Sequence, residues 1–215
     1  MSEEELPPEL ARMEERSAKR KLELKRLLVD GPTAETRFNK PVRLWPEGGV
    51  FCAVLRGPVG ALCGYAMVPE GHPWWGLCED EEVPTPAAVD LEQHPEQFMD
   101  DHGTVPAFLA MAAEGGIESF ARRLGGQVQV HGGLTWAGPM AIEGAPWGWW
   151  IGFDCGHHRD ATDPAHVMPG LARFNDAEIA EGGHVWTEAE VALEVGRLVT
   201  AILAAGVKSL AEGTL

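Results

Sequence analysis

The pattern of hydrophobic and polar positions predicts a charged helix at the start of the chain, followed by a folded body. Residues 9–29 carry many charged side chains and few sizeable apolar ones, at spacings compatible with a helix. Gly31 and Pro32 predict its end. We expect this helix to project from the body or to pack with one end only. We therefore divide the chain into a charged helical arm at residues 1–31 and a single α+β domain at residues 32–215.

Four segments of the body have the pattern of strands. Residues 50–55 and 59–68 are apolar runs separated by Arg56, Gly57 and Pro58, a composition typical of a hairpin turn. Residues 127–131 alternate polar and apolar side chains, and residues 147–154 form an aromatic-rich run. We expect these segments to pair in a mainly antiparallel sheet.

Two further segments have helical periodicity. Residues 107–124 predict two short helices or one kinked helix, because Gly115 and Gly116 interrupt the apolar pattern. Thr187 and Glu190 have the spacing of a capping box, and they precede an apolar stripe that we expect to pack on the sheet. The stripe consists of Val191, Val195, Leu198, Val199, Ile202 and Leu203. The predicted fold class is α+β, a mainly antiparallel sheet flanked by helices, with a charged N-terminal helix.

Charge disfavours a nucleic-acid polymer as the partner. The net charge is −16, and residues 1–30 contain 8 acids and 7 bases, so nearly all of the excess lies in the body. No Lys or Arg occurs between Arg56 and Arg122, whereas the proline-punctuated stretch at 79–105, expected to be mostly loop, is strongly acidic. Binding to DNA or RNA depends on cationic side chains that displace counterions, and an acidic surface repels such a polymer.

Neither export nor membrane insertion is indicated. The chain has no run of 18 apolar residues, and it opens with Glu3, Glu4 and Glu5 where a leader would have basic residues. The 4 cysteines are too sparse for a disulfide scaffold and form no CxxC pair, which favours reduced thiols in the cytoplasm.

Histidines recur at the ends of the apolar segments, each beside glycine. His72 follows Gly71, His131 precedes Gly132 and Gly133, and His157 follows Gly156. A strand end gives a reactive side chain a rigid base, and glycine permits a positive φ or a close approach of the backbone to a ligand. The loops at His131 and at residues 154–160 are therefore the predicted site.

These segments resemble a family of uncharacterised proteins from bacteriophages and actinobacterial genomes. The resemblance rests on His131-Gly-Gly-Leu-Thr-Trp136 and on Gly152-Phe-Asp-Cys-x-His157 with a further Asp at 160, and it covers residues 64–160 and the last helix. It implies a phage or prophage origin, hence the cytoplasm of a bacterial host, and a shared site without a particular reaction. His158 and Arg159 depart from the small residue and glycine expected there.

A metal-dependent hydrolase is the first interpretation of these residues. His131, Asp154, His157 and Asp160 offer the nitrogen and oxygen donors that suit zinc or manganese. His72, or the cluster Asp100, Asp101 and His102, would complete the shell. None of the specific zinc signatures, such as HExxH, occurs in the sequence. A metal held there would activate water against a phosphoester-like or nucleotide-like substrate.

A second interpretation makes Cys155 a nucleophile with His157 or His131 as its base, because a thiolate needs a neighbouring imidazole. If residues 154–156 are extended, Asp154 points away from His157 and cannot orient it. The catalytic candidates are therefore His131, Asp154, Cys155 and His157.

A third interpretation is binding without reaction. Six of the 8 tryptophans, Trp74, Trp75, Trp136, Trp147, Trp149 and Trp150, surround the same loops, and indoles stack well on nucleobases. A nucleotide signal would then lie between Trp74 and Trp136, with His72, His158 and Arg159 on its phosphate. The helix at residues 9–29 is a further candidate surface, for a second copy of the chain or for a host protein.

Overall fold

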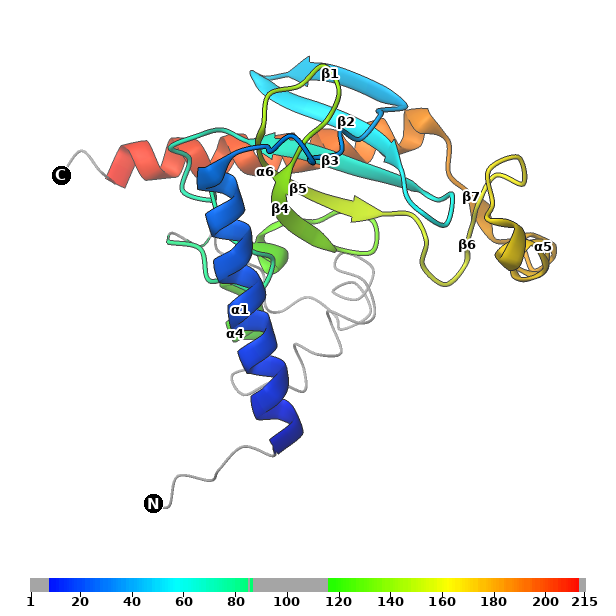
Figure 1. The fold of residues 1–215 in the computed structure, drawn as a ribbon, viewed down its shortest axis with the longest axis horizontal. Helices are drawn as coiled ribbons and strands as arrows, with labels where there is room; N and C mark the ends of the chain where they lie inside the picture. The colour runs from blue at the N-terminus through cyan, green and yellow to red at the C-terminus, as the bar shows by residue number, and fades with distance from the viewer. Residues whose placement is uncertain (1–7, 85, 87–115, 213–215) are drawn as a thin grey trace.

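A five-stranded antiparallel sheet forms the centre of the protein in a computed structural model that describes residues 8–84, 86 and 116–212. Its strand order is β1-β2-β3-β5-β4, with helices on its flanks (Figure 1). The strands are β1 (Arg43–Glu47), β2 (Val50–Arg56), β3 (Leu62–Val68), β4 (Trp136–Met140) and β5 (Gly148–Asp154). The α+β class with a mainly antiparallel sheet is confirmed.

The hairpin predicted around Gly57 joins β2 to β3. Cys52 pairs with Ala66 and Arg56 pairs with Leu62, and the turn is closed by the N–H of Gly57, which donates to the carbonyl of Ala61 at 2.8 Å. Side chains alternate along these strands, so that each strand contributes to a separate apolar cluster on each face of the sheet.

Helix α6 (Glu188–Glu212) covers one face of the sheet. The predicted capping box is present, because Thr187 N donates to Glu190 Oε2 at 2.8 Å and Glu190 N donates back to Thr187 Oγ1 at 3.3 Å. The apolar stripe behind it packs on β2 and β3 within the main core, except that Leu203 is 42% exposed at its margin. Burial of this stripe holds the helix in place on the sheet, and it therefore also positions the residues near the start of the helix.

The opposite face carries a smaller apolar cluster. Its buried members are Ala53, Leu55, Met140, Ile142 and Trp150. Half-buried aromatic residues, including Tyr65 and Trp136, pack around it. Strand β5 therefore has side chains in both clusters, which explains why residues 148–153 are all buried.

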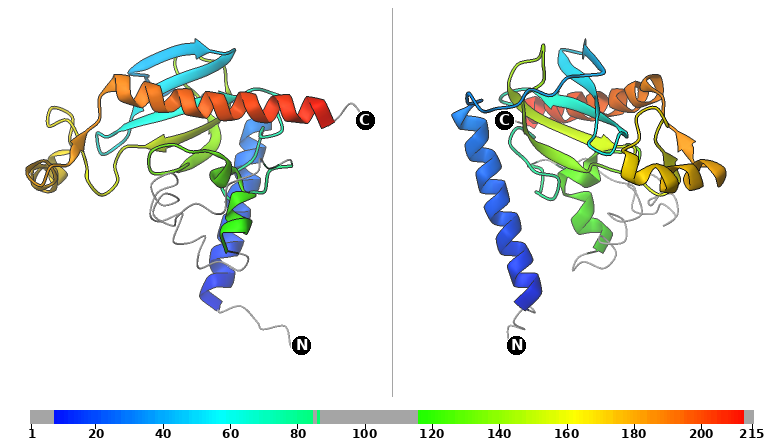
Figure 2. Two further views of the ribbon diagram at one scale, coloured as in Figure 1. Left: turned by 180° about the vertical axis from the view of Figure 1, so that it is seen from behind. Right: turned by 45° about the vertical axis from the view of Figure 1, so that its right-hand side comes forward.

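The charged N-terminal segment forms helix α1 (Pro8–Asp30), which packs at one end. Its C-terminal part contacts β4, where Leu24 and Leu28 pack against the main core. Lys21 and Lys25 pair with Asp80 at 2.7 Å and Glu81 at 2.6 Å, respectively. Towards its N-terminus the helix extends away from the sheet (Figure 2).

Short elements complete the described part of the chain. These are α4 (Gly116–Ala121), the 3-10 turns η1 (Leu124–Gln127) and η2 (Pro169–Leu171), α5 (Ala172–Ala180), and the parallel pair β6 (Asp160–Ala161) and β7 (His184–Val185). Among the helices of the described residues, none combines the length and the apolar character needed to cross a membrane.

The strand predicted at residues 127–131 is wrong. Gln127 ends η1, and although Val128 and Val130 are buried in the alternating way that suggested a strand, this stretch joins no ladder within the described residues. The sequence pattern instead missed β1 and β4, the two edge strands, which contain Pro46 and Pro139. The first half of the helix predicted over 107–124, most of the acidic stretch and the cluster at 100–102 lie outside the described residues.

Candidate functional site

Two segments far apart in the chain bring their polar side chains together beside the start of α6. His131 lies in a tight turn, where the N–H of Gly133 donates to the carbonyl of Val130 at 2.9 Å. His157 lies in the loop after β5, and Asp160 opens β6. We call His131, His157 and Asp160 the donor cluster. One ligand atom from each of them lies within 4.8 Å of the others.

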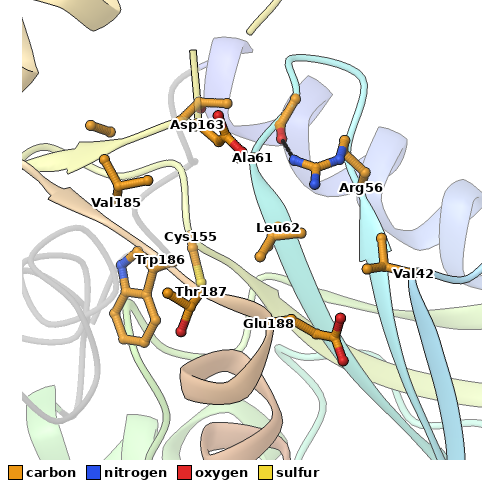
Figure 3. Close-up of a pocket in the computed structure, with 13 residues that line it drawn as sticks. Val42, Arg56, Ala61, Leu62, Cys155, Asp163, Val185, Trp186, Thr187 and Glu188 are labelled. Atoms are coloured by element: carbon orange, nitrogen blue, oxygen red, sulfur yellow. Dashed lines mark hydrogen bonds between the residues drawn. The ribbon is translucent and has the colours of Figure 1, made fainter. Parts of the chain in front are cut away.

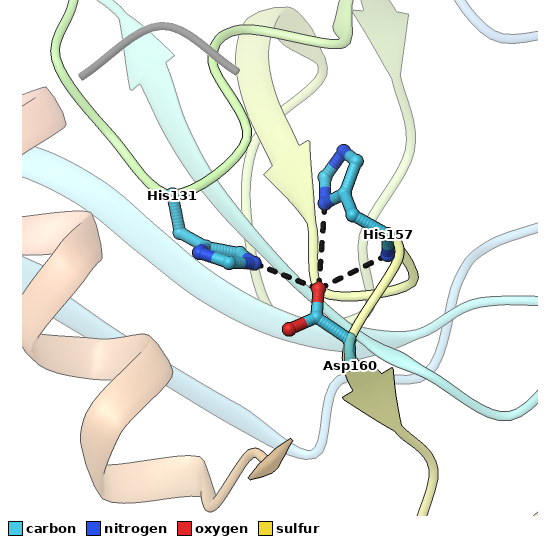
Figure 4. Close-up of side chains that lie close together, drawn as sticks. All are labelled: His131, His157 and Asp160. Carbon is cyan, nitrogen blue, oxygen red and sulfur yellow. Dashed lines mark hydrogen bonds and ion pairs between the residues drawn. The ribbon is translucent and has the colours of Figure 1, made fainter. Parts of the chain in front are cut away.

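The carboxylate of Asp160 is the centre of the donor cluster (Figure 4). Its Oδ2 lies 2.7 Å from His131 Nε2 and accepts the backbone N–H of His157 at 3.0 Å. Its Oδ1 accepts the indole N–H of Trp186 at 2.8 Å. Burial alone would raise the pKa of Asp160, but these hydrogen bonds outweigh it and hold the pKa well below its usual range. The carboxylate is therefore ionised although only 5% of its side chain is exposed.

The ring of His157 is held less closely than that of His131. Its Nδ1 is buried 3.5 Å from Asp160 Oδ2, outside hydrogen-bond geometry, and it makes no hydrogen bond within the described part of the chain. Its Nε2 lies 4.0 Å from Asp154 Oδ1. Asp160 is the main cause that raises the pKa of His157, burial opposes it, and the charge of Asp154 adds to the rise. His157 Nδ1 is therefore held by charge and not by a hydrogen bond, and it points at the same carboxylate oxygen as His131 Nε2.

Glycine at position 132 allows the two histidines to meet. Gly132 has φ +67°, and a Cβ built there would overlap the imidazole of His157. The two imidazoles lie edge to face with ring centroids 5.4 Å apart. Glycine beside His131 was predicted to allow a close approach to a ligand. In the structure it allows the close approach of the His157 imidazole.

Asp154 lies at the edge of the cluster. The chain turns after Asp154, because its Oδ1 accepts the N–H of Gly156 at 3.1 Å, and this turn brings the same oxygen to 4.0 Å from His157 Nε2. Residues 155–157 do not continue the strand. The condition under which Asp154 would point away from His157 is therefore not met. The Asp154 side chain is 40% exposed and faces solvent beside His157.

The geometry argues against Cys155 as a nucleophile. Cys155 is only 2% exposed and belongs to the main core. Burial, reinforced by the charge of Asp160, raises the pKa of its thiol well above the usual value. An activated thiolate needs the opposite shift and an accessible sulfur. We remove Cys155 from the catalytic candidates.

His72 lies apart from the donor cluster. Its Nδ1 accepts the N–H of Trp74 at 3.0 Å, so its Nε2 carries the proton and donates to the carbonyl of Ile202 at 2.8 Å. Ile202 lies two turns along α6 from Glu194, the residue that contacts His131, which corresponds to about 12 Å along the helix. His72 therefore joins a loop to α6, and neither ring nitrogen is free for a ligand.

The tryptophans predicted to form stacking walls are largely in the two apolar clusters. Trp74, Trp149 and Trp150 are 3%, 0% and 0% exposed. Trp136 is half-buried in the smaller cluster, where it meets the ring of Tyr65 edge-on at 5.8 Å. A buried indole offers no face to a nucleobase, so Trp74 is not a binding wall, and Trp136 lies on the face of the sheet away from α6.

His158 and Arg159 follow the cluster as an exposed turn. The His158 side chain is 81% exposed and lies 3.7 Å from Glu178. Arg159 has φ +72°, the sole non-glycine residue of the described chain in that region, and its carbonyl accepts the N–H of His184 at 2.8 Å. This turn reverses the chain between His157 and Asp160, so that both face His131.

Two residues of the site carry no signal in the sequence. Trp186 donates to Asp160, and its ring lies 4.4 Å from that of His131. Glu194, on α6, accepts the backbone N–H of His131 at 3.1 Å and is only 14% exposed. Glu194 lies four residues after the capping-box residue Glu190, and Trp186 lies just before the box, but only the fold shows that this helix start faces His131.

The chain has no recognised relative among the proteins with which it was compared. No protein-family model, no curated protein and no solved structure matches it.

Proposed function

We propose that the donor cluster holds a divalent metal ion, zinc or manganese, and that the protein is a small hydrolase of phosphoester-like or nucleotide-like substrates. The observation that carries this proposal is the convergence of two imidazoles and one carboxylate from two distant segments within 4.8 Å. Two histidines with one carboxylate form a common set of protein ligands in catalytic zinc sites, where the remaining position takes water or substrate.

The donor chemistry fits such an ion. Asp160 is ionised, and Nδ1 of His157 lacks a hydrogen-bond partner within the described residues. His131 Nε2 lies 2.7 Å from Asp160 Oδ2, so the proton that Nε2 donates in this hydrogen bond is the one that a metal ion bound there would displace. Trp186 holds the second oxygen of Asp160, which is the outer-shell support that metal-ligating carboxylates usually have.

The residues around the cluster supply the parts of a hydrolytic site. A bound metal ion would lower the pKa of a water molecule and polarise the substrate. Asp154, exposed beside His157, is placed to accept a proton from such a water. Arg159 and His158 are exposed on the adjoining turn and would offset the negative charge of a phosphoester. The acidic body favours a small substrate over a polymer.

Metal binding tests the first half of the proposal. The protein, stripped with a chelator, is titrated with Zn²⁺ and with Mn²⁺ by calorimetry, alongside the variants His131→Ala and His157→Ala. His166→Ala is the matched control, since the His166 side chain is half exposed and does not belong to the donor cluster. We expect one site in the wild type and in the control, and none in the other two. Equal binding by all four proteins would reject the site.

Turnover tests the second half. The metal-loaded protein is incubated with aryl phosphomonoesters, aryl phosphodiesters and linear and cyclic nucleotides, and products are separated by chromatography. We expect turnover that the chelator abolishes and that His157→Ala lacks. A nucleotide that binds but is recovered intact after denaturation would replace the hydrolase with a binding protein. Metal binding without turnover or nucleotide binding would leave a structural metal centre and reject the hydrolase.

A further inference from the structure

A cavity of about 230 Å³ is lined by Leu62, Cys155 and Trp186 among others (Figure 3). The β2–β3 hairpin, β6, β7 and the start of α6 surround it. Asp160 and Ala161 are consecutive residues of β6 and point to opposite faces, Asp160 towards the histidines and Ala161 into the cavity. The cavity is therefore separate from the donor cluster, and Trp186 forms a wall between them.

The floor of the cavity is apolar. Leu62, Cys155 and Ala161 line it and are each less than a tenth exposed, and Trp186 adds an aromatic wall. An apolar cavity of about 150 Å³ is large enough to bind benzene. The larger volume here admits a side chain of that size together with a few polar atoms.

The rim of the cavity carries charged groups of both signs that can still accept or donate hydrogen bonds. Within the described residues, the guanidinium of Arg56 makes a single hydrogen bond, from Nη1 to the carbonyl of Gly60 at 2.8 Å, which leaves its other N–H groups to bind a carboxylate. Among the described residues, the carboxylate of Glu188 has one long ion pair, 3.7 Å from Arg43. Figure 3 shows Arg56 and Glu188 at separate points of the rim.

We propose that this cavity binds a small zwitterion of amino-acid size. Its carboxylate would bind Arg56, its ammonium group would bind Glu188, and its apolar part would lie on Leu62, Cys155 and the indole of Trp186. A simple anion would meet the carboxylates of Asp163 and Glu188, and a simple cation would meet Arg56. A ligand with both charges pairs with Arg56 and Glu188, while Asp163 Oδ1 already accepts the N–H of Ala165 at 2.9 Å. This site is independent of the proposed hydrolase activity.

The test uses the twenty free amino acids as probes of the full-length protein. Calorimetry and thermal shift measure binding, and the best probe is then compared with its amide and its N-acetyl derivative. We expect at least one amino acid to bind one to one and to raise Tm. Each derivative should bind at least ~10-fold more weakly, because each lacks one charge-assisted interaction.

Variants locate the binding. Arg56→Gln and Glu188→Gln should each weaken the best probe by at least ~10-fold. Arg37→Gln, a change at an exposed arginine away from the cavity, should leave binding unchanged. The probe should bind equally before and after the protein is stripped with a chelator, which separates this site from the metal centre. Absence of binding by all twenty amino acids, equal binding of the amide, or full binding by folded Arg56→Gln would each overturn the proposal.

Discussion

The imidazole of His131 and the carboxylate of Asp160, 29 residues apart in the chain, meet at 2.7 Å. This contact connects a turn before β4 to the short strand β6, and Asp160 also accepts the backbone N–H of His157. The same carboxylate therefore holds the loops in place and supplies a ligand atom. Stability and ligand binding must both be measured on any variant of these residues.

Replacement of Asp160 by Asn should lower stability. The amide keeps the shape but removes the charge, and its NH₂ group would face donors on at least one side. We expect a loss of about 1–3 kcal/mol in the free energy of unfolding, as for other buried polar groups left without a partner. Urea denaturation at neutral pH measures it. Asp163→Asn, at a carboxylate that is 49% exposed, is the control and should lose less than about 0.5 kcal/mol.

The stability of the cluster should depend on pH in a defined window. The pKa of Asp160 is lowered in the folded protein, so its contribution is present above the unfolded value of about 3.9 and is lost as pH falls towards the folded value. The pKa of His157 is raised, so its contribution is full below about pH 6.5 and is lost as pH rises through the folded value. Together they contribute most between about pH 4 and pH 6.5.

This dependence can be isolated with one variant. Urea unfolding is measured at pH 6 and at pH 8.5 for the wild type, His157→Gln and His166→Gln. We expect the wild type and His166→Gln to lose stability over this interval by more than His157→Gln does. Identical pH slopes in all three proteins would show that His157 is not held by the carboxylates of Asp160 and Asp154.

Alanine at position 132 should disturb the cluster more than backbone strain alone would. Gly132 and Gly76 have similar positive φ values, +67° and +81°, but a Cβ at Gly76 meets nothing within 4 Å, whereas one at Gly132 overlaps the His157 ring. Gly76→Ala therefore costs only the left-handed strain of about 1–2 kcal/mol. Gly132→Ala should cost more and should also displace His157 and weaken Zn²⁺ binding. Equal losses of unfolding free energy would contradict the close approach.

The sequence predicted the loops of the site because their chemistry is local. Glycine beside His131 and the clustered donors at 154–160 are visible in short segments, and the capping box at Thr187 fixed the start of α6. Trp186 could not be selected, because an indole one residue before a helix cap has no local feature that shows what its N–H meets. The burial of Trp74 and Cys155 likewise depends on how α6 closes over the sheet, which strand and helix periodicities do not specify.

The edge strands likewise could not be predicted from local sequence patterns. Strands β1 and β4 contain proline, which disfavours the interior of a sheet, but both lie at an edge where fewer ladder bonds are needed. Residues 127–131 have the alternation of a strand but lack a partner in the described chain. A segment becomes a strand only when another strand pairs with it, and local periodicity does not show which segments pair.

Trp186 should act as a positioning residue for Asp160. Its indole N–H holds Asp160 Oδ1 at 2.8 Å and leaves Oδ2 to the histidines. Trp186→Phe keeps an aromatic wall but removes this hydrogen bond, so we expect Zn²⁺ affinity to fall by about 10- to 100-fold, the usual effect of losing an outer-shell partner. Trp147→Phe is the matched control, because it removes an indole bond of 3.3 Å to the carbonyl of Leu28, away from the cluster. Calorimetry that shows equal affinities for the two variants would reject the positioning role.

Loss of Lys25 should loosen helix α1. Lys25 lies 2.6 Å from Glu81, whose other oxygen accepts the N–H of Cys78 at 2.8 Å, so this pair connects the helix to an ordered turn of the body. Lys25→Ala removes it but keeps the apolar contacts of Leu24 and Leu28 with the core, so the helix should open more often without detaching. Amide hydrogen exchange over residues 20–30 should accelerate several-fold, and added salt should reduce the difference from the wild type because the ion pair is screened. Arg26→Ala is the control, since Arg26 is 80% exposed and, within the described chain, pairs with Asp30 of the same helix at 3.2 Å and not with the body. Equal exchange in the two variants would show that the apolar contacts alone hold the helix.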